Sequence, residues 1–299
     1  MDLKQMKLFI AIVETGSYTR AGEREGYTQS RVTQIMKSLE TELGFPLFLK
    51  DHFGAELTKS GRALLPRIQQ ILQDYNKLNE EISGISGMHE GSLSIGTHIS
   101  CAIEWLPDIL RTFNTRYPGI HLSVYEGGQK QILQNLREHR VDIGLISRPD
   151  EAENPDIQFL PLIEDRMKLV VPQGDPLVQI DCVSTDALNG RTFVLCENDF
   201  DSDVRNILER TVSDYSIRFT LRNDYSVIAM VRKNLGISIL PSLILKSANM
   251  SGITSISLDS NWKRTLGIGL LKNSRPGPAE KIIIKELQGY VLEKADKKD

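Results

Sequence analysis

The chain has 299 residues, of which 40% are hydrophobic and 25% are charged, as in ordinary globular proteins. This length predicts two or more domains, each large enough to bury a core. The formal net charge is −3, and residues 1–65 carry nine basic and eight acidic side chains. This balance gives no support for strong nonspecific binding of nucleic acid, because that affinity grows with the number of phosphates neutralised.

The sequence contains no transmembrane run, and its first apolar stretch, residues 8–13, is too short for the core of a signal peptide. The three cysteines, Cys101, Cys182 and Cys196, are odd in number and form no C-x-x-C pair. We therefore expect a protein of the reducing cytoplasm, without a disulfide framework, a zinc site or another cofactor.

Two helices are predicted at the start of the chain. The first has an apolar face at helical spacing and ends at Gly16. Ser17 can cap a second, short helix over residues 19–25, which Gly26 ends. The apolar positions of the first helix are Leu3, Met6, Phe9, Ile10 and Val13.

A third helix is predicted after Thr28, whose hydroxyl can accept a hydrogen bond from the free amides of the first turn. Its apolar face comprises Val32, Ile35, Met36 and Leu39. Its other face has donors and positive charge but no acidic residue, and it comprises Gln29, Ser30, Arg31, Thr33, Gln34 and Lys37. Such a face suits the major groove of DNA, which admits one helix and offers base edges to amide, hydroxyl and guanidinium groups.

A helix, a short glycine turn and a second helix form the helix-turn-helix plan. Gly44 ends the long helix, and residues 47–57 are interpreted as a small β-hairpin, or wing, that places Lys50 and His52 near phosphate. The alternative is a three-helix packing unit that does not bind DNA. The predicted DNA-binding residues are Thr28, Gln29, Ser30, Arg31, Thr33, Gln34, Lys37 and Lys50.

One long helix is predicted from Lys59 to about residue 86. Its apolar residues alternate spacings of three and four, which is a heptad seam typical of a paired helix. They are Leu64, Ile68, Ile71, Tyr75, Leu78, Ile82 and Ile85. Pairing with a second copy would join two DNA-reading units on paired half-sites. The alternative is that the helix packs on its own domain. Glycines at 84, 87 and 91 indicate a hinge after it.

Beyond the hinge, short strands alternate with helices in two successive runs. The predicted strands are 93–95, 120–125, 141–146, 168–171, 192–196, 218–222, 237–240 and 265–272, and a last helix begins near Pro278. The alternation predicts an α/β domain of two lobes with parallel strands. Two such lobes suggest a cleft, because open α/β sheets bind ligands beyond the carboxyl ends of their strands.

The loops at those strand ends supply the candidate pocket. Ser100 can cap the helix that holds Trp105, so that neighbouring free amides face an anion; the alternative is that it is only a cap. Gly128 follows another glycine, in a tight loop or a close approach to ligand. The predicted effector-binding residues are Thr97, His98, Ser100, Gly128, Ser147, Glu197, Asn198 and Ser226.

The whole pattern resembles the LysR-type transcriptional regulators. Residues 3–23 (LKQMKLFIAIVETGSYTRAGE), 28–48 (TQSRVTQIMKSLETELGFPLF) and 57–65 (LTKSGRALL) are similar to their DNA-binding domain. The segments GSLSIG, LPDILRTFNTRYPGIHLSVYEGG, LREHRVDIGLI and NLGISILP are similar to their effector domain. The resemblance spans nearly the whole chain.

This resemblance implies an all-α winged helix-turn-helix domain at residues 1–58, a linker and dimerisation helix with a hinge at 59–88, and an effector domain at 89–299. The effector domain would be α/β with two lobes, like type 2 periplasmic solute-binding proteins. Lobe I would comprise about 92–170 and 268–299, and lobe II about 171–267. Such regulators are homodimers or homotetramers that bind double-stranded promoter DNA and respond to a small effector.

Three residues depart from the family's pattern. Arg31, Ile35 and Tyr27 stand where a small residue, a glutamine and an aliphatic residue are common. Arg31 and Ile35 can change the sequence preference, and Arg31 can contact guanine or phosphate.

Two other classes of function are weighed against a ligand-responsive regulator. An enzyme is disfavoured because the five histidines are scattered and no G-x-S-x-G, H-E-x-x-H or G-x-x-x-x-G-K-[ST] motif occurs. A small-molecule-binding protein without DNA binding is a further alternative. His98 can bond a ligand or serve as a structural histidine. A redox-sensing regulator would link Cys182 to Cys196, yet a cysteine in a buried strand mostly packs as a small hydrophobe.

Overall fold

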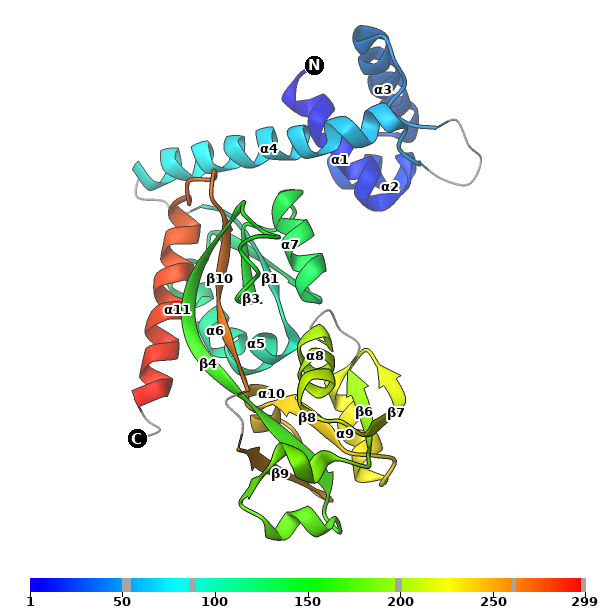
Figure 1. Cartoon of the computed structure of the whole chain (residues 1–299). Coiled ribbons are helices and arrows are strands. Elements are labelled where there is room, and N and C mark those ends of the chain that lie inside the picture. Colours follow the sequence, from blue (N-terminus) through cyan, green and yellow to red (C-terminus); the bar gives the residue numbers. More distant parts are fainter. Residues whose placement is uncertain (50–54, 86–89, 197–200, 260–261, 297–299) are drawn as a thin grey trace. The chain divides into compact units, whose positions relative to one another are not determined.

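The computed structural model describes residues 1–49, 55–85, 90–196, 201–259 and 262–296 (Figure 1). The chain divides into two compact units, an N-terminal unit (Met1–Gly91 with Arg137–Arg140) and a C-terminal unit (Ser92–Leu136 with Val141–Asp299). Within the described ranges, none of the helices has both the length and the apolar character needed to cross a membrane.

The N-terminal unit contains the predicted helices, with caps at the predicted residues. They are α1 (Leu3–Thr15), α2 (Tyr18–Glu25), α3 (Gln29–Leu43) and α4 (Lys59–Ile85). The Ser17 hydroxyl accepts from the amide of Arg20, and the Thr28 hydroxyl accepts from the amide of Arg31. Gly16, Gly26 and Gly44 end their helices in the left-handed conformation, which glycine adopts without a steric penalty.

A glycine inside α2 allows the tight turn into α3. A Cβ atom on Gly22 would lie 2.6 Å from the backbone oxygen of Tyr27 and 3.1 Å from a methyl group of Val32. Any larger residue there would push α3 away from α2. Below this turn, α1, α2 and α3 bury a common core that includes Leu8, Phe9 and Met36.

The segment after α3 pairs with the segment that precedes α4. Phe48 and Leu57 form an antiparallel bridge, and the amide of Leu49 donates to the carbonyl of Glu56 at 2.7 Å. These contacts are the base of the hairpin predicted as a wing. Its predicted tip, with Lys50 and His52, lies outside the described residues.

Helix α4 divides its heptad seam between two environments. Its first part packs on the three helices, where the seam residue Ile68 is buried together with Leu65, which lies outside the seam. Its second part leaves apolar side chains exposed, with exposed fractions of 44% for Ile71, 52% for Leu78 and 55% for Ile82. The packing alternative therefore describes the start of the helix, whereas the later seam has an apolar surface suited to a partner helix.

The C-terminal unit is built on an eight-stranded mixed sheet of order β2-β1-β3-β10-β4-β9-β5, in which β8 also pairs with β4. A two-stranded parallel sheet of β6 and β7 completes lobe II. The strands are β1 (Gly91–Thr97), β2 (Ile120–Glu126), β3 (Ile143–Ser147), β4 (Ile157–Pro172), β5 (Cys182–Val183), β6 (Arg191–Cys196), β7 (Tyr215–Leu221), β8 (Ser238–Pro241), β9 (Ile253–Leu258) and β10 (Lys263–Leu271).

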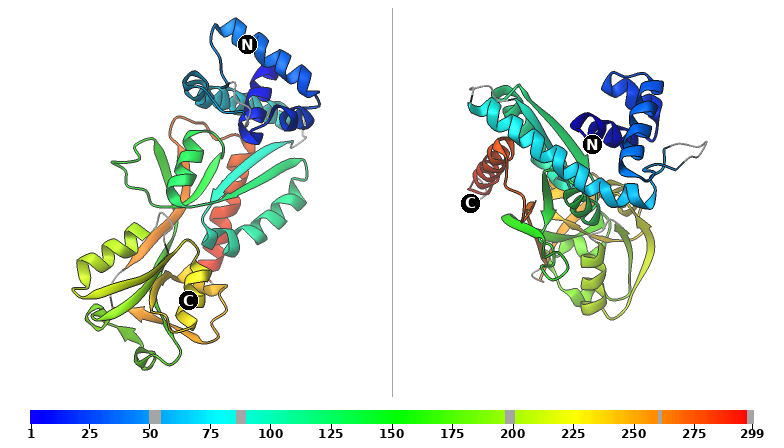
Figure 2. Two further views of the ribbon diagram at one scale, coloured as in Figure 1. Left: turned by 90° about the vertical axis from the view of Figure 1, so that its right-hand side faces the viewer. Right: turned by 90° about the horizontal axis from the view of Figure 1, so that it is seen from above.

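Helices cover both faces of each lobe. In lobe I, α6 and α11 pack on one face around Phe113 and Ile283, while α7 covers the other with Ile132 (Figure 2). In lobe II, α8 packs against Phe193 on one side, and α9 and α10 cover Val194 on the other. The helices are α5 (Ile99–Glu104), α6 (Leu106–Arg116), α7 (Gln129–Arg137), α8 (Asp201–Thr211), α9 (Asp224–Arg232), α10 (Ser242–Lys246) and α11 (Pro278–Asp296), with short 3-10 turns at Pro176–Gln179 and Thr185–Leu188.

The two lobes share two long antiparallel strands, β4 and β10 (Figure 1). The sequence predicted only 168–171 as a strand here, which was too short because Pro161 and the charged run at 164–166 interrupt the apolar pattern. Pro161 is accommodated at a register shift opposite Gly267. A Cβ atom on Gly267 would lie 2.3 Å from the carbonyl oxygen of Leu160, so this position requires glycine. Strand β4 pairs with β10 up to Arg166 and with β8 and β9 beyond it. The chain therefore passes from lobe I to lobe II before Val171, where the boundary was predicted.

Candidate DNA-binding surface and effector cleft

The exposed face of α3 consists of uncharged polar and basic side chains. Gln29, Ser30, Arg31, Gln34 and Lys37 are exposed, and Thr33 is half-buried. Arg31 donates from Nη1 to Oε1 of Gln34 at 2.8 Å. In the described part of the chain, neither Arg31 nor Lys37 pairs with a carboxylate. The face therefore presents donors that are available to the base edges and phosphates of DNA.

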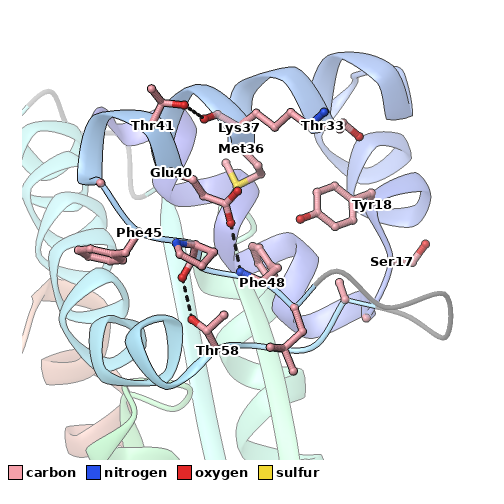
Figure 3. Close-up of a pocket in the computed structure, with 15 residues that line it drawn as sticks. Ser17, Tyr18, Thr33, Met36, Lys37, Glu40, Thr41, Phe45, Phe48 and Thr58 are labelled. Atoms are coloured by element: carbon pink, nitrogen blue, oxygen red, sulfur yellow. Dashed lines mark hydrogen bonds between the residues drawn. The ribbon is translucent and has the colours of Figure 1, made fainter.

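Glu40, which lies three residues after Lys37 on α3, is engaged by backbone amides. Its Oε1 accepts from the amide of Leu47 at 2.7 Å and from the amide of Phe48 at 3.2 Å (Figure 3). Burial and the charge of Glu40 raise the pKa of Tyr18 to about 12, so its phenol stays protonated. Glu40 thus holds the segment after α3 in place.

A groove of about 1000 Å³ runs between the start of α2, the inner edge of α3 and the segment after α3 (Figure 3). Ser17, Thr33 and Lys37 supply polar groups to its lining, and Phe45 and Leu49 supply exposed apolar surface. The groove thus brings the Ser17 cap of α2 beside Thr33 and Lys37 of α3.

The second candidate site is a cavity of about 100 Å³ within the C-terminal unit. Its residues come from the ends of β1 and β2 in lobe I, from the β7–α9 turn in lobe II, and from the crossing strand β10. They are His98, Ile99, Ser100, Glu126, Gly127, Gly128, Arg222, Asn223, Asp224 and Arg264.

The cavity includes some of the predicted pocket residues and leaves out others. His98, Ser100 and Gly128 line it. The described lining does not include Thr97, Ser147 or Ser226, and Glu197 and Asn198 lie outside the described residues. Thr97 is buried and its hydroxyl donates to the carbonyl of His98 at 3.1 Å, whereas Ser226 is exposed on α9.

Sequence reasoning did not single out Arg222, Asn223 or Arg264. The rule that ligands bind beyond the carboxyl ends of strands would have indicated Arg222 and Asn223 if the strand predicted at 218–222 had ended at Leu221, as β7 does. No sequence signal indicates Arg264, because it lies inside a strand and reaches the cavity only through the pairing of β10 with β4.

The predicted cap at Ser100 is wrong. Helix α5 begins at Ile99, and its N-cap is His98, whose side chain makes no capping hydrogen bond. Ser100 lies two residues after the N-cap, at the second position of the helix, and so cannot cap it. Its hydroxyl instead accepts from Nη2 of Arg264 at 2.8 Å. Ser100 therefore joins lobe I to a crossing strand.

Arg264 forms a buried ion pair with Asp165, its partner across β10 and β4. Arg264 Nε and Nη2 lie 2.9 and 2.8 Å from Oδ2 of Asp165. Oδ1 of Asp165 accepts from the hydroxyl of Ser242 at 2.8 Å and from the amide of Leu243 at 2.9 Å. The side chains are 9% and 3% exposed, so both charges depend on this network for solvation.

His98 forms a neutral wall of the cavity. Burial, and then the positive charge of Arg264, lowers its pKa to about 3, against the smaller opposing effects of hydrogen bonds to Gln129 and Gly127. Its Nε2 lies 3.3 Å from Oε1 of Gln129, which also accepts from the amide of Ser147 at 3.0 Å. The Ser147 hydroxyl is buried and has no hydrogen-bond partner among the described residues.

The three cysteines are all unlinked, and they differ in exposure. Cys182 is exposed, whereas Cys101 and Cys196 are buried. Burial is the main cause that raises the pKa of Cys101 to about 12. Cys196 forms a side-chain hydrogen bond with Asp224. Among the described residues, no group of three or more His, Cys, Asp and Glu side chains is arranged to hold a metal ion.

Comparison with protein families identifies both units. Residues 3–62 match the bacterial regulatory helix-turn-helix protein, lysR family, and residues 86–291 match the LysR substrate binding domain. The chain belongs to the LysR family. It is therefore a DNA-binding transcriptional regulator with an effector-binding domain, and its family is not enzymatic.

Relatives and solved structures agree over the full length of this LysR-family protein. It is 25% identical to the uncharacterized transcriptional regulator YvbU of Bacillus subtilis (strain 168), covering 97% of this chain and 99% of YvbU. Its fold is similar to a full-length OxyR variant from Pseudomonas aeruginosa (TM-score 0.77, 19% identity, coverage 97% and 94%). It is also similar to full-length CbnR complexed with its target DNA (TM-score 0.68, 20% identity, coverage 98% and 99%).

Proposed function

We propose that this regulator reads promoter DNA with the α3 face of Gln29, Ser30, Arg31, Gln34 and Lys37. The observation that carries the proposal is that these side chains are exposed together on one helix, while the nearby Glu40 is engaged by backbone amides. Amide and guanidinium groups can form paired hydrogen bonds with adenine and guanine edges. Thr28 and Thr33 would contribute hydroxyls beside them, and Lys50 would contact phosphate from the wing.

Two copies would pair through the second part of α4. Ile71, Leu78 and Ile82 are spaced by seven and four residues and are about half exposed. Burying this seam against its copy removes apolar surface from water and joins two α3 helices on one duplex. Dimers paired in this way can associate further into a tetramer. The similarity in fold to CbnR, which was solved in complex with its target DNA, supports DNA binding by this chain. Such a protein would act in the cytoplasm, with the promoter.

The cavity between the lobes would hold a small effector. Its walls come from both lobes and from β10, so a ligand there contacts groups that move relative to one another when the lobes close. An effector shifts the equilibrium only through unequal affinity for two states, and a hundredfold preference supplies about 2.7 kcal/mol. Closing the lobes would change the spacing of the DNA-binding units within the oligomer.

Promoter binding by the full chain tests this proposal. Fluorescence anisotropy would compare the duplex upstream of the protein's own gene with a shuffled duplex of equal length and composition, over a series of salt concentrations. We expect tighter binding of the natural duplex and a protein mass of at least a dimer in light scattering. A monomer that binds both duplexes equally would contradict the proposal.

A further inference from the structure

The charges around the effector cavity indicate which chemical class of ligand it takes. Four charged side chains line it: Glu126 at the end of β2, Arg222 and Asp224 at the β7–α9 turn, and Arg264 on β10. Each lobe thus contributes one carboxylate, and one arginine comes from lobe II. The cavity is far smaller than the roughly 300–1,000 Å³ pockets of drug-sized ligands, so its ligand has few non-hydrogen atoms.

The buried arginine is already compensated by the protein. Two nitrogens of Arg264 lie within 2.9 Å of Asp165, and Nη2 also donates to Ser100. An anionic ligand that approached Arg264 would have to compete with a buried carboxylate at ion-pair distance. The positive charge at the base of the cavity is therefore a poor receptor for a simple anion.

Two carboxylates, Glu126 and Asp224, line the cavity together with its arginines. Burial raises the pKa of Asp224, against the opposing effects of the Cys196 hydrogen bond and the Arg264 charge, so its ionised form is costly without a further cation. At the neighbouring Tyr225, burial raises the pKa first, and the charges of Glu104, Asp224 and Glu126 raise it further. Asp224 and Glu126 are therefore both close enough to Tyr225, the residue next to Asp224, to act on the same hydroxyl.

We propose that the cavity binds a small α-amino acid, with its ammonium group at Glu126 and Asp224 and its carboxylate at Arg222. A cationic amine alone would leave Arg222 opposed to it, and a carboxylate alone would meet two acids; a zwitterion complements all three side chains. An ammonium ion between carboxylates of the two lobes would also favour closure of the cleft. This inference rests on the proposed function, because it takes this cavity as the effector site.

Matched ligand pairs test the proposal on the full-length protein. L-Alanine and L-lactate differ by an ammonium group in place of a hydroxyl, and glycine and glycolate differ in the same way. Calorimetric titration should detect L-alanine or glycine, with L-lactate and glycolate weaker by more than about tenfold. Equal or tighter binding of the hydroxy acids would overturn the proposal, as would the absence of binding by either amino acid at millimolar concentration.

Charge-removing variants test the placement of the ammonium group. Asp224→Asn and Glu126→Gln should each weaken binding of the amino acid by about tenfold or more. Glu126 is exposed at the end of an edge strand, so its variant should fold even if the Asp224 variant does not. Asp186→Asn, which removes an exposed acid elsewhere in lobe II, is the matched control and should bind as the wild type does. Unchanged affinity in Glu126→Gln would contradict the placement.

Promoter binding by the same preparations separates the two proposals. If the protein binds the natural duplex but does not prefer amino acids to the matched hydroxy acids, only the ligand class is overturned. If amino acids bind but promoter DNA is not recognised, the proposed function fails while the ligand class stands.

Discussion

Arg264 and Asp165 face each other where β10 and β4 pass from one lobe to the other. Their ion pair is tied to lobe I through the Ser100 hydroxyl and to α10 through the Ser242 hydroxyl and the Leu243 amide. Helix α10 packs in turn with residues of both lobes, since Leu243 joins the lobe I core and Ile244 joins a lobe II core. A single buried pair therefore links the cavity wall to the crossing strands.

Breaking this pair should destabilise the effector domain. Asp165→Asn leaves the Arg264 charge buried without its counter-charge, and we expect a loss of about 3–5 kcal/mol in the free energy of unfolding. Urea unfolding of the full chain, followed by tryptophan fluorescence, measures it. The control is Glu164→Gln, which removes a carboxylate that pairs with Lys263 on the surface and should cost about 0–1 kcal/mol. Equal effects of the two variants would contradict the role of the buried pair.

His98 should make stability depend on pH in a specific range. The folded state holds it neutral with a pKa of about 3, whereas in the unfolded chain it takes up a proton below about pH 6.5. The free energy of unfolding is therefore unaffected by His98 titration above pH 6.5. As the pH is lowered from 6.5 towards 3, protonation of the unfolded chain lowers the free energy of unfolding by about 1.4 kcal/mol per pH unit. Comparing unfolding of wild type and His98→Gln between pH 7 and 5 isolates the effect. Parallel curves for the two proteins would rule it out.

Gln29 should contribute to the choice of DNA sequence. Gln29→Ala removes an amide that can pair with a base edge, so affinity for the natural promoter should fall by about 1–3 kcal/mol with little change for the shuffled duplex. Anisotropy titrations measure both. Gln70→Ala removes the same chemical group from α4 and should leave affinity unchanged. If Gln29→Ala preserves affinity and sequence preference, Gln29 is not a contact residue.

Charge placed in the α4 seam should separate the protomers. Leu78 is 52% exposed, and Leu78→Lys would bury an ammonium group in the paired seam. We expect a lower mass in analytical ultracentrifugation and weaker promoter binding, because each protomer would then bind one half-site alone. Asn79→Lys adds the same charge at the neighbouring exposed position and serves as the control. A Leu78→Lys protein that keeps the wild-type mass would place the interface elsewhere.

Peroxide should not link Cys182 to Cys196. Cys182 is exposed, but Cys196 is buried and hydrogen-bonded to Asp224, which disfavours attack at its sulfur. Peptide mass spectrometry after mild peroxide treatment tests this. A linked Cys182–Cys196 peptide, together with altered promoter binding, would establish the redox alternative instead.

The N-terminal helices could be predicted because their signals are local. The caps at Ser17 and Thr28, the glycines at 16, 26 and 44, and the apolar spacing of α3 act between residues three or four positions apart. The polar face of α3 is fixed by the same spacing. Even so, the direction of the Glu40 carboxylate was not predictable, because its partners at Leu47 and Phe48 lie beyond the helix end.

The effector cavity was only partly predictable, because its residues meet through pairing between distant segments. The strand-end rule led to His98, Ser100 and Gly128, but Ser100 was given a capping role, whereas the N-cap position is occupied by His98. The length of β4 was missed because a proline and three successive charges lie in a strand that spans two lobes. Local spacing thus determined the DNA-reading helix, whereas the cavity was decided by tertiary structure: Arg264 reaches Asp165 and Ser100 across 99 and 164 residues, and no short-range pattern records such contacts.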